Sequence, residues 1–237
     1  MKLTLLIVLQ SSLIVAHYTF KSISLPKTNT NFPTWQYLRR WNSQVWDPVI
    51  DDIWPIYNSR VESIDIRCNV NATSAPDTLT IRAGEELSIN VPYTISHPGP
   101  LMAYLARVPD GKTAVNWEGD GEVNGDVDQA VGWPNYGKSS VSFTIPLSTP
   151  SGEYLFRVEH IGLQTAANIG SQHFVSCAQI EVAGGGLGVP GPKTAFPGAY
   201  SLDDEVFHVN LYVGLNETTY LKEPYVTRTP GPVIWKG

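Results

Sequence analysis

Apolar and polar side chains alternate along several short stretches of this chain. Leu87, Ile89 and Val91 are separated by Ser88 and Asn90, and the same period of two recurs further along. Such alternation is typical of strands with one buried face, whereas a helix would repeat its apolar residues every three or four positions. The pattern predicts strands over residues 18–25, 87–93, 102–108, 141–145, 154–159, 174–182 and 207–213.

Turn residues separate these segments, and the sequence indicates no long amphipathic helix. The chain contains 20 glycines and 18 prolines, whereas charged residues make up only 16% of it. Many short strands joined by such turns favour an all-β fold, an immunoglobulin-like or fibronectin-like antiparallel β-sandwich with long loops. The Gly/Pro-rich stretch 184–192 is brief and strand character resumes after it. We therefore expect one domain over residues 17–237.

The first residues have the features of a secretory signal. Lys2 precedes an apolar segment over residues 3–15, and Val15-Ala16 supplies a small-residue cleavage site. We therefore expect residues 1–16 to be removed and the protein to be secreted and extracellular. His17 would then become the first residue and offer its free α-amine and a ring nitrogen together to one metal ion. The alternative is that cleavage falls elsewhere, or that this histidine has no special role.

Charge, cysteines and glycosylation sequons fit a secreted protein. The formal charge of −6 gives no electrostatic footprint for nucleic acid or an anionic membrane, so we expect neither as a partner. Cys68 and Cys177 form an even pair in a chain expected to be secreted, which predicts one disulfide. Two Asn-x-Thr sequons predict glycosylation at Asn71 and Asn216.

The stretch 32–57 is rich in aromatic residues and follows neither a strand nor a helix period. It holds four of the seven tryptophans, namely Trp35, Trp41, Trp46 and Trp54. A long ordered loop is usually functional, and exposed aromatic rings suit stacking on sugars or on a protein partner. The alternative is that most of these rings are buried locally and hold the loop together.

A second histidine stands in a turn that proline and glycine make rigid. His97 lies in Ser96-His97-Pro98-Gly99-Pro100. The His17 amine, the His17 ring and the His97 ring would give three neutral nitrogens in a T shape, which suits Cu(II). The absence of a carboxylate argues against calcium or magnesium, and zinc would want a fourth ligand. The remaining histidines, His160, His173 and His208, lie in or directly next to the expected strand segments.

Seven short motifs follow the N-terminal histidine in order along nearly the whole chain. They are WQYLR (35–39), DIRCN (65–69), SHPGP (96–100), YLARVPD (104–110), PSGEYLFRVE (150–159), CAQI (177–180) and FPGAY (196–200). In order and spacing the chain resembles the fungal lytic polysaccharide monooxygenases of auxiliary-activity family 9, formerly glycoside hydrolase family 61. The resemblance implies a secreted copper enzyme that oxidises a glycosidic C–H bond in a β-linked polysaccharide, either cellulose or hemicellulose.

The resemblance also implies the metal ligands, the disulfide and the co-reactants. His17 and His97 would hold one copper ion per chain as a histidine brace, and Cys68 would pair with Cys177. An external electron donor would reduce the copper, and hydrogen peroxide or oxygen would be the oxidant. We expect the protein to act as a monomer on its polysaccharide.

Two positions depart from the family pattern. The family has Gln-x-Tyr-x-x-Cys where this chain reads Gln172-His173-Phe174-Val175-Ser176-Cys177, so Phe174 stands in place of an axial tyrosine. Gln164 stands where the family has a histidine that hydrogen-bonds the oxidant. Gln172 and Gln164 would therefore orient the oxidant, and Phe174 would close the axial side. Alternation puts Gln172 and Phe174 on one strand face. His160 shares the parity of Gln164, but we expect it to lie further from the metal.

Aromatic residues would form the substrate surface. Tyr212 matches a family position where a ring stacks on a sugar, and Trp46 or Trp54 would extend that surface. The changes at Phe174 and Gln164 leave open a non-catalytic member of the family that binds copper or glycan. A third interpretation is an immunoglobulin-like adhesion domain, in which the two histidines coincide by chance. The mature N-terminus separates this third interpretation from the others, because any first residue other than His17 would make the brace impossible.

Overall fold

The structure is a computed structural model that describes residues 17–42, 54–120, 123–129, 133–211, 229–233 and 235, with the backbone alone over 123–129. The predicted signal segment 1–16 lies outside these residues. So do the predicted substrate residues Trp46 and Tyr212 and the predicted glycosylation site Asn216.

The first sheet has the strand order β2-β1-β5-β8, and all of its pairs are antiparallel. Its members are β1 (Ser22–Leu25), β2 (Thr30–Asn31), β5 (Glu86–Asn90) and β8 (Ser140–Thr144). In β8 the residues alternate strictly between exposed and buried. This alternation is what a strand shows when one face packs on a second layer and the other meets water.

The second sheet has the order β11-β7-β6-β9-β10-β3, and β4 pairs in parallel with β10. Its strands are β3 (Ile56–Tyr57), β4 (Leu79–Arg82), β6 (Leu101–Arg107), β7 (Val123–Gln129), β9 (Gly152–Gly162), β10 (Gln172–Ala183) and β11 (Lys193–Thr194). The long strands β9 and β10 are buried over nearly their whole length. Both faces of this sheet are therefore covered.

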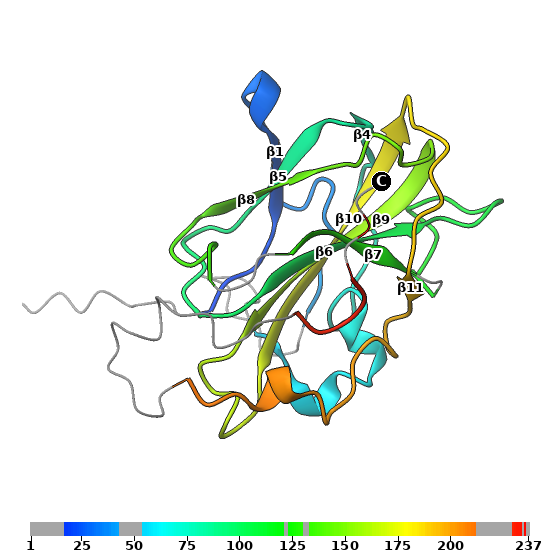
Figure 1. Ribbon diagram of the computed structural model, residues 1–237. Helices are drawn as coiled ribbons and strands as arrows, with labels where there is room; N and C mark the ends of the chain where they lie inside the picture. Colours follow the sequence, from blue (N-terminus) through cyan, green and yellow to red (C-terminus); the bar gives the residue numbers. More distant parts are fainter. Residues whose placement is uncertain are drawn as a thin grey trace, which may run out of the picture.

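Each face of the second sheet has its own core. Tyr154, Phe156 and Val158 of β9 pack between the two sheets with residues of β1, β5 and β8. Leu155 and Ile161 face the other way, toward loops that carry short 3-10 helices. These helices are η2 (Asn58–Arg60), η3 (Ile64–Ile66) and η4 (Glu205–His208), and Figure 1 shows them on the side of the second sheet that faces away from the first sheet. A further 3-10 turn, η1 (Pro26–Thr28), follows β1.

The predicted disulfide is present. Cys68, just after η3, is bonded to Cys177 of β10, with a Cα–Cα distance of 5.2 Å. The loops with 3-10 helices form a layer over one face of the second sheet, and we call it the loop layer. The disulfide attaches this layer covalently to the centre of the sheet.

The predicted fold class, an all-β antiparallel sandwich, is confirmed, but three predicted strands are wrong in part. The strand expected over residues 87–93 is β5, which already ends at Asn90. Residues 207–213 were expected to form a strand, yet η4 ends at His208, so His208 is not in a strand. The Asp204 carboxylate accepts a hydrogen bond from the Val206 N–H and so caps this helical turn. At the other end of the chain β1 begins only at Ser22, because its partner β5 ends at Asn90 shortly before Pro92, which has no N–H.

Candidate metal centre

Strand β9 holds the His97 loop in place. The Ile161 N–H donates to the Pro100 carbonyl and the Leu163 N–H donates to the Pro98 carbonyl, both at 2.9 Å. Between them Gly99 approaches so closely that a Cβ there would lie 1.7 Å from the Ile161 carbonyl oxygen. Only glycine fits this position. Hydrogen bonds on both sides of Gly99 thus hold the SHPGP motif rigidly against a buried strand.

The rings of His17 and His97 lie close together. Their centroids are 5.6 Å apart and their planes meet at 79°, an edge-on arrangement. His97 is only 8% exposed, whereas His17 is half-buried. Burial lowers the pKa of His17, and burial together with the charge of His17 lowers the pKa of His97 to about 4. Both rings are therefore neutral at pH 7 and keep a free lone pair.

Gly162, at the end of β9, lies close to three of the predicted site residues. A Cβ there would lie 2.7 Å from Gln164 Oε1, 3.1 Å from His97 Cβ and 3.4 Å from Phe174 Cε2. Phe174 is buried, and its ring centroid lies 5.6 Å from that of His97 and 5.9 Å from that of His17. The fold thus brings together the residues that the sequence placed at the site.

Gln164 and Gln172 form a hydrogen-bonded pair. The Gln164 Nε2 donates to the Gln172 Oε1 at 2.5 Å. Gln172 opens β10 and shares the face of Phe174, as strand alternation predicted. Because the Gln172 oxygen is already engaged, its amide nitrogen is the end left to donate to a molecule bound beside the histidines.

The described residues fit a metal ion with nitrogen ligands. The Nε2 atoms of His17 and His97 and the Oε1 atom of Gln164 are buried without a hydrogen-bond partner in the described part of the chain. Such buried polar atoms are costly unless something binds them. That part contains no group of three His, Cys, Asp or Glu that could hold a metal, so the two rings need a further donor. An α-amine on His17 would supply it.

The predicted aromatic surface is represented by one described residue. Trp54 is 39% exposed, and its ring centroid lies 5.5 Å from that of His17. Trp41 is instead buried at 4% exposure, and Trp35 packs partly buried against the core between the sheets. Local burial therefore explains Trp41 and, in part, Trp35, whereas Trp54 stands beside the candidate site.

Sequence reasoning missed Tyr18 as part of this site. Its ring stacks on Phe174 with centroids 4.4 Å apart and planes at 20°. Its hydroxyl forms a 2.5 Å hydrogen bond with Nδ1 of His160, which is buried between the sheets. Burial lowers the pKa of His160 to about 3, so this imidazole is neutral. Direct adjacency to His17 was the only sequence signal for Tyr18.

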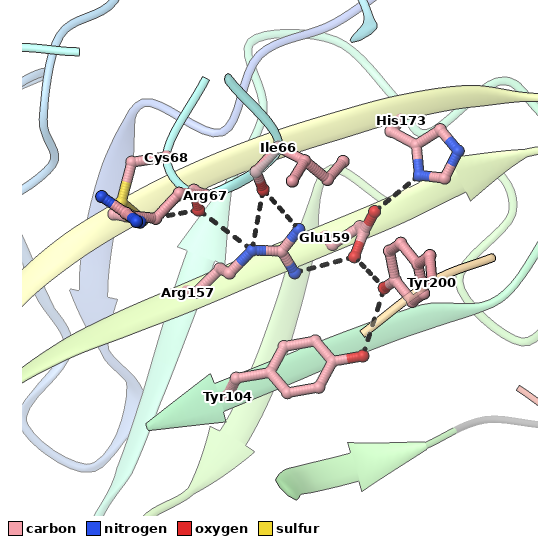
Figure 2. A network of polar contacts seen from close by, with 9 residues as sticks. Ile66, Arg67, Cys68, Tyr104, Arg157, Glu159, His173 and Tyr200 are labelled. Carbon is pink, nitrogen blue, oxygen red and sulfur yellow. Dashed lines mark hydrogen bonds and ion pairs between the residues drawn. A yellow bond between two sulfur atoms is a disulfide. The ribbon is translucent and has the colours of Figure 1, made fainter. Parts of the chain in front are cut away.

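A second feature missed from sequence is a buried ionic network on the loop face of β9 and β10. Figure 2 shows Glu159 between Arg157 and His173, each 2.7 Å from one of its carboxylate oxygens. The Tyr200 hydroxyl also donates to Glu159. Burial by itself would raise the pKa of Glu159, but Arg157 and the His173 hydrogen bond lower it to about 2. The carboxylate is therefore charged and fully paired.

The same network continues from Arg157 into the loop layer. The guanidinium donates to the backbone carbonyls of Ile66 and Arg67, next to the disulfide at Cys68. At its other end Ser171 Oγ lies 3.0 Å from His173 Nε2. His173 is the neighbour of Gln172, so the network fixes the start of β10 from the face opposite the candidate site.

Asn71 is exposed and has a left-handed backbone conformation with φ of 51°. Thr73, the third residue of the sequon, is exposed as well. The sequon is thus accessible at the surface, as glycosylation requires. None of the described helices is long and apolar enough to cross a membrane.

Comparisons with known proteins agree with this arrangement. Residues 17–220 match the model of Auxiliary Activity family 9 (formerly GH61). The chain is 40% identical to AA9 family lytic polysaccharide monooxygenase H of Malbranchea cinnamomea, over 94% of this chain and 93% of that protein. It is 39% identical to lytic polysaccharide monooxygenase C of Emericella nidulans, with the same coverage. The extended catalytic domain of H. jecorina LPMO9A has the same fold, with a TM-score of 0.74 at 21% identity, over 93% of this chain and 92% of that one.

Fold and relatives together define the class as that of oxidoreductases that cleave polysaccharides. Within this class the chain belongs to Auxiliary Activity family 9. The resemblance inferred from the seven motifs is thereby confirmed.

Proposed function

We propose that this protein is a secreted, copper-dependent monooxygenase that cleaves a β-linked polysaccharide, cellulose or hemicellulose, by oxidation. The observation that carries the proposal is the meeting of two neutral histidine rings, each with an unpartnered buried nitrogen, in a chain of family 9. Cu(II) prefers neutral nitrogen donors in tetragonal geometry. His17 and His97 would hold one copper ion as a histidine brace.

The brace depends on processing of the chain. In the unprocessed chain the nitrogen of His17 is part of a peptide bond and is a poor metal ligand. Removal of residues 1–16 would convert it to an amine, the third donor that the described residues lack. The family match begins at residue 17, which supports cleavage at that point. The mature protein would then be a single extracellular domain over residues 17–237, with glycans at Asn71 and Asn216.

Bound copper would supply one-electron redox chemistry, with electrons from an external donor and with hydrogen peroxide or oxygen as oxidant. The protein's own residues would position the reactants. The Gln172 amide can donate a hydrogen bond to the oxidant, and Gln164 keeps Gln172 in that orientation. Neither glutamine titrates, so the pair can orient but cannot deliver a proton as an imidazole would. Phe174 presents an apolar ring to both histidines.

The substrate would bind at the exposed side of the site. Trp54 lies against the His17 ring and is the most accessible of the described aromatic residues there. An indole face of this kind suits stacking on a sugar ring. Trp46 and Tyr212 are the further residues that we expect on this surface.

The decisive experiment is product analysis with protein processed to begin at His17. Cellulose and hemicelluloses would be incubated with protein, copper, a reductant and hydrogen peroxide, and soluble products would be examined for oxidised ends by mass spectrometry. A variant with one alanine inserted before His17 is the matched control, because it keeps both rings but lacks the adjacent amine. Oxidised products from the parent and none from the control support the proposal. Equal products from both would contradict it.

A second candidate function is a non-catalytic member that binds copper or glycan. The observation in its favour is that Gln164 and Phe174 replace a titratable ring and a phenol beside the site. Tight copper binding without oxidised products on any of the polysaccharides would support this alternative.

A further inference from the structure

Two segments that are distant in sequence carry the candidate ligands, and one buried side chain contacts both. Tyr18 follows His17, and Gly99 lies two residues after His97. His160 of β9 is 1% exposed and lies between them. Its Nδ1 is 2.5 Å from the Tyr18 hydroxyl and its Nε2 is 3.2 Å from the Gly99 carbonyl oxygen.

The chemistry of the partners fixes the direction of both hydrogen bonds. A carbonyl oxygen only accepts, so His160 Nε2 must carry the proton that it shares with Gly99. In a neutral imidazole the other nitrogen is then an acceptor, so the Tyr18 hydroxyl donates to Nδ1. The chain of donors runs from Tyr18 through His160 to Gly99, and each polar atom in it is used.

Tyr18 and Gly99, at the two ends of this series of hydrogen bonds, have different further contacts. The Pro100 carbonyl of the His97 loop accepts from Ile161 of β9, and the Pro98 carbonyl accepts from Leu163 just after β9. Tyr18 instead precedes β1, which begins at Ser22, and its ring stacks on Phe174. The stack fixes the plane of the ring, whereas the hydroxyl fixes its position along β9. Ring contacts through Phe174 also connect the two segments, and the bond from Tyr18 to His160 adds the hydrogen bond that fixes the register of the N-terminal segment against the His97 loop.

We propose that the Tyr18–His160–Gly99 tether presets the spacing of the His17 and His97 rings before a metal ion binds. Tyr18 and His160 are thus positioning residues. This inference rests on the proposed metal site and adds to it. A site whose ligands already stand in place loses less conformational entropy when the ion arrives, so its affinity is higher.

The test compares two buried tyrosines whose hydroxyls bond to different partners. Tyr18→Phe removes the link to His160 but keeps the ring that stacks on Phe174. Tyr154→Phe is the matched control, because Tyr154 is equally buried and donates its hydroxyl proton to the Pro150 carbonyl near the opposite end of β9. Both variants lose one tyrosine hydrogen bond, so a general loss of stability should be similar in the two.

Cu(II) affinity of the processed protein is the main readout, measured by isothermal titration calorimetry in competition with a chelator. Tyr18→Phe should weaken binding by roughly 10–100-fold, the range usual when an outer partner of a ligand is lost. Tyr154→Phe should bind within about twofold of the parent. Electron paramagnetic resonance of the Tyr18→Phe protein should also show a broader spread of copper parameters.

A second pair of variants tests the middle of the tether. His160→Gln retains one donor and one acceptor in the side chain, whereas His160→Leu retains neither. Affinity should be higher in His160→Gln than in His160→Leu. Unchanged affinity in Tyr18→Phe, or an equal loss in Tyr154→Phe, would overturn the tether while leaving the metal site intact. A parent protein that binds no Cu(II) would instead overturn the proposed site itself.

Discussion

Glu159→Gln removes the charge at the centre of the buried ionic network and leaves the shape of the side chain nearly unchanged. One carboxylate oxygen faces His173 and the other faces Arg157 and the Tyr200 hydroxyl. A glutamine can accept on one side only, and it leaves Arg157 as a buried cation at 2% side-chain exposure with no opposite charge. Loss of one partner of a buried ion pair costs about 3–5 kcal/mol.

The same ion pairs also make the free energy of unfolding depend on pH. The pKa of Glu159 falls from 4.5 to about 2 on folding. A lowered acid pKa stabilises the folded state above the unfolded pKa, and this contribution is lost as the pH falls through the folded value. The difference corresponds to about 3 kcal/mol, lost between about pH 5 and pH 2. The ionised Glu159 therefore contributes a few kcal/mol to the free energy of unfolding at pH 7.

Urea unfolding with the disulfide intact would measure this effect. We expect Glu159→Gln to lower the free energy of unfolding at pH 7 by about 3–5 kcal/mol, and to flatten its pH dependence below pH 5. A domain of this size should lose about 2–4 °C in Tm per kcal/mol. The double variant Arg157→Met, Glu159→Gln removes both charges and should regain at least half of the loss. A cost below about 1 kcal/mol, or simple additivity in the double variant, would refute the reasoning.

Three further predictions concern the site and the disulfide. His97→Ala should abolish tight Cu(II) binding and the nitrogen couplings seen by electron paramagnetic resonance, whereas the surface variant His208→Ala should keep both. Replacing Cys68 and Cys177 by serine should cost about 4–5 kcal/mol, because their bond closes a 109-residue separation; denaturant midpoints below those of the parent would show it. The double variant Gln164→His, Phe174→Tyr should oxidise polysaccharide faster than the parent, toward the low end of the roughly 10²–10⁴-fold that a positioned proton donor contributes. It should also survive excess peroxide longer, and no gain in rate or lifetime would contradict the roles given to these two positions.

Strands with one solvent-exposed face were predictable from the sequence, whereas strands with both faces buried were predictable only in part. In β8 the alternating pattern maps directly onto exposure. Strand β9 runs from Gly152 to Gly162, beyond the predicted 154–159, because it pairs with the buried strand β10 over its whole length. Strand β7 has the sequence VNGDVDQ, which offers too few apolar residues for its pattern to be detected.

In the candidate site, residues with a local sequence motif were predictable, whereas contacts between distant residues were not. His97 was found because proline and glycine mark its turn, and His17 because a signal segment precedes it. The hydrogen bond from Tyr18 to His160 spans 142 positions, and only tertiary packing creates it. Trp41 and Trp54 lie in one aromatic stretch, yet one is buried and the other is exposed. Composition alone does not separate them, because the separation depends on which ring reaches the core.

The two faces of β9 also restrict how this family member can change over generations. Glu159 faces the loop layer and its neighbour His160 faces the sheet interior, where each has fixed partners. Insertion or deletion of one residue within the strand would exchange the faces of every residue beyond it. A carboxylate would then meet Tyr18, and an imidazole would meet Arg157. Length variants should therefore be absent from this strand in functional descendants, and diversity there should arise by substitution alone.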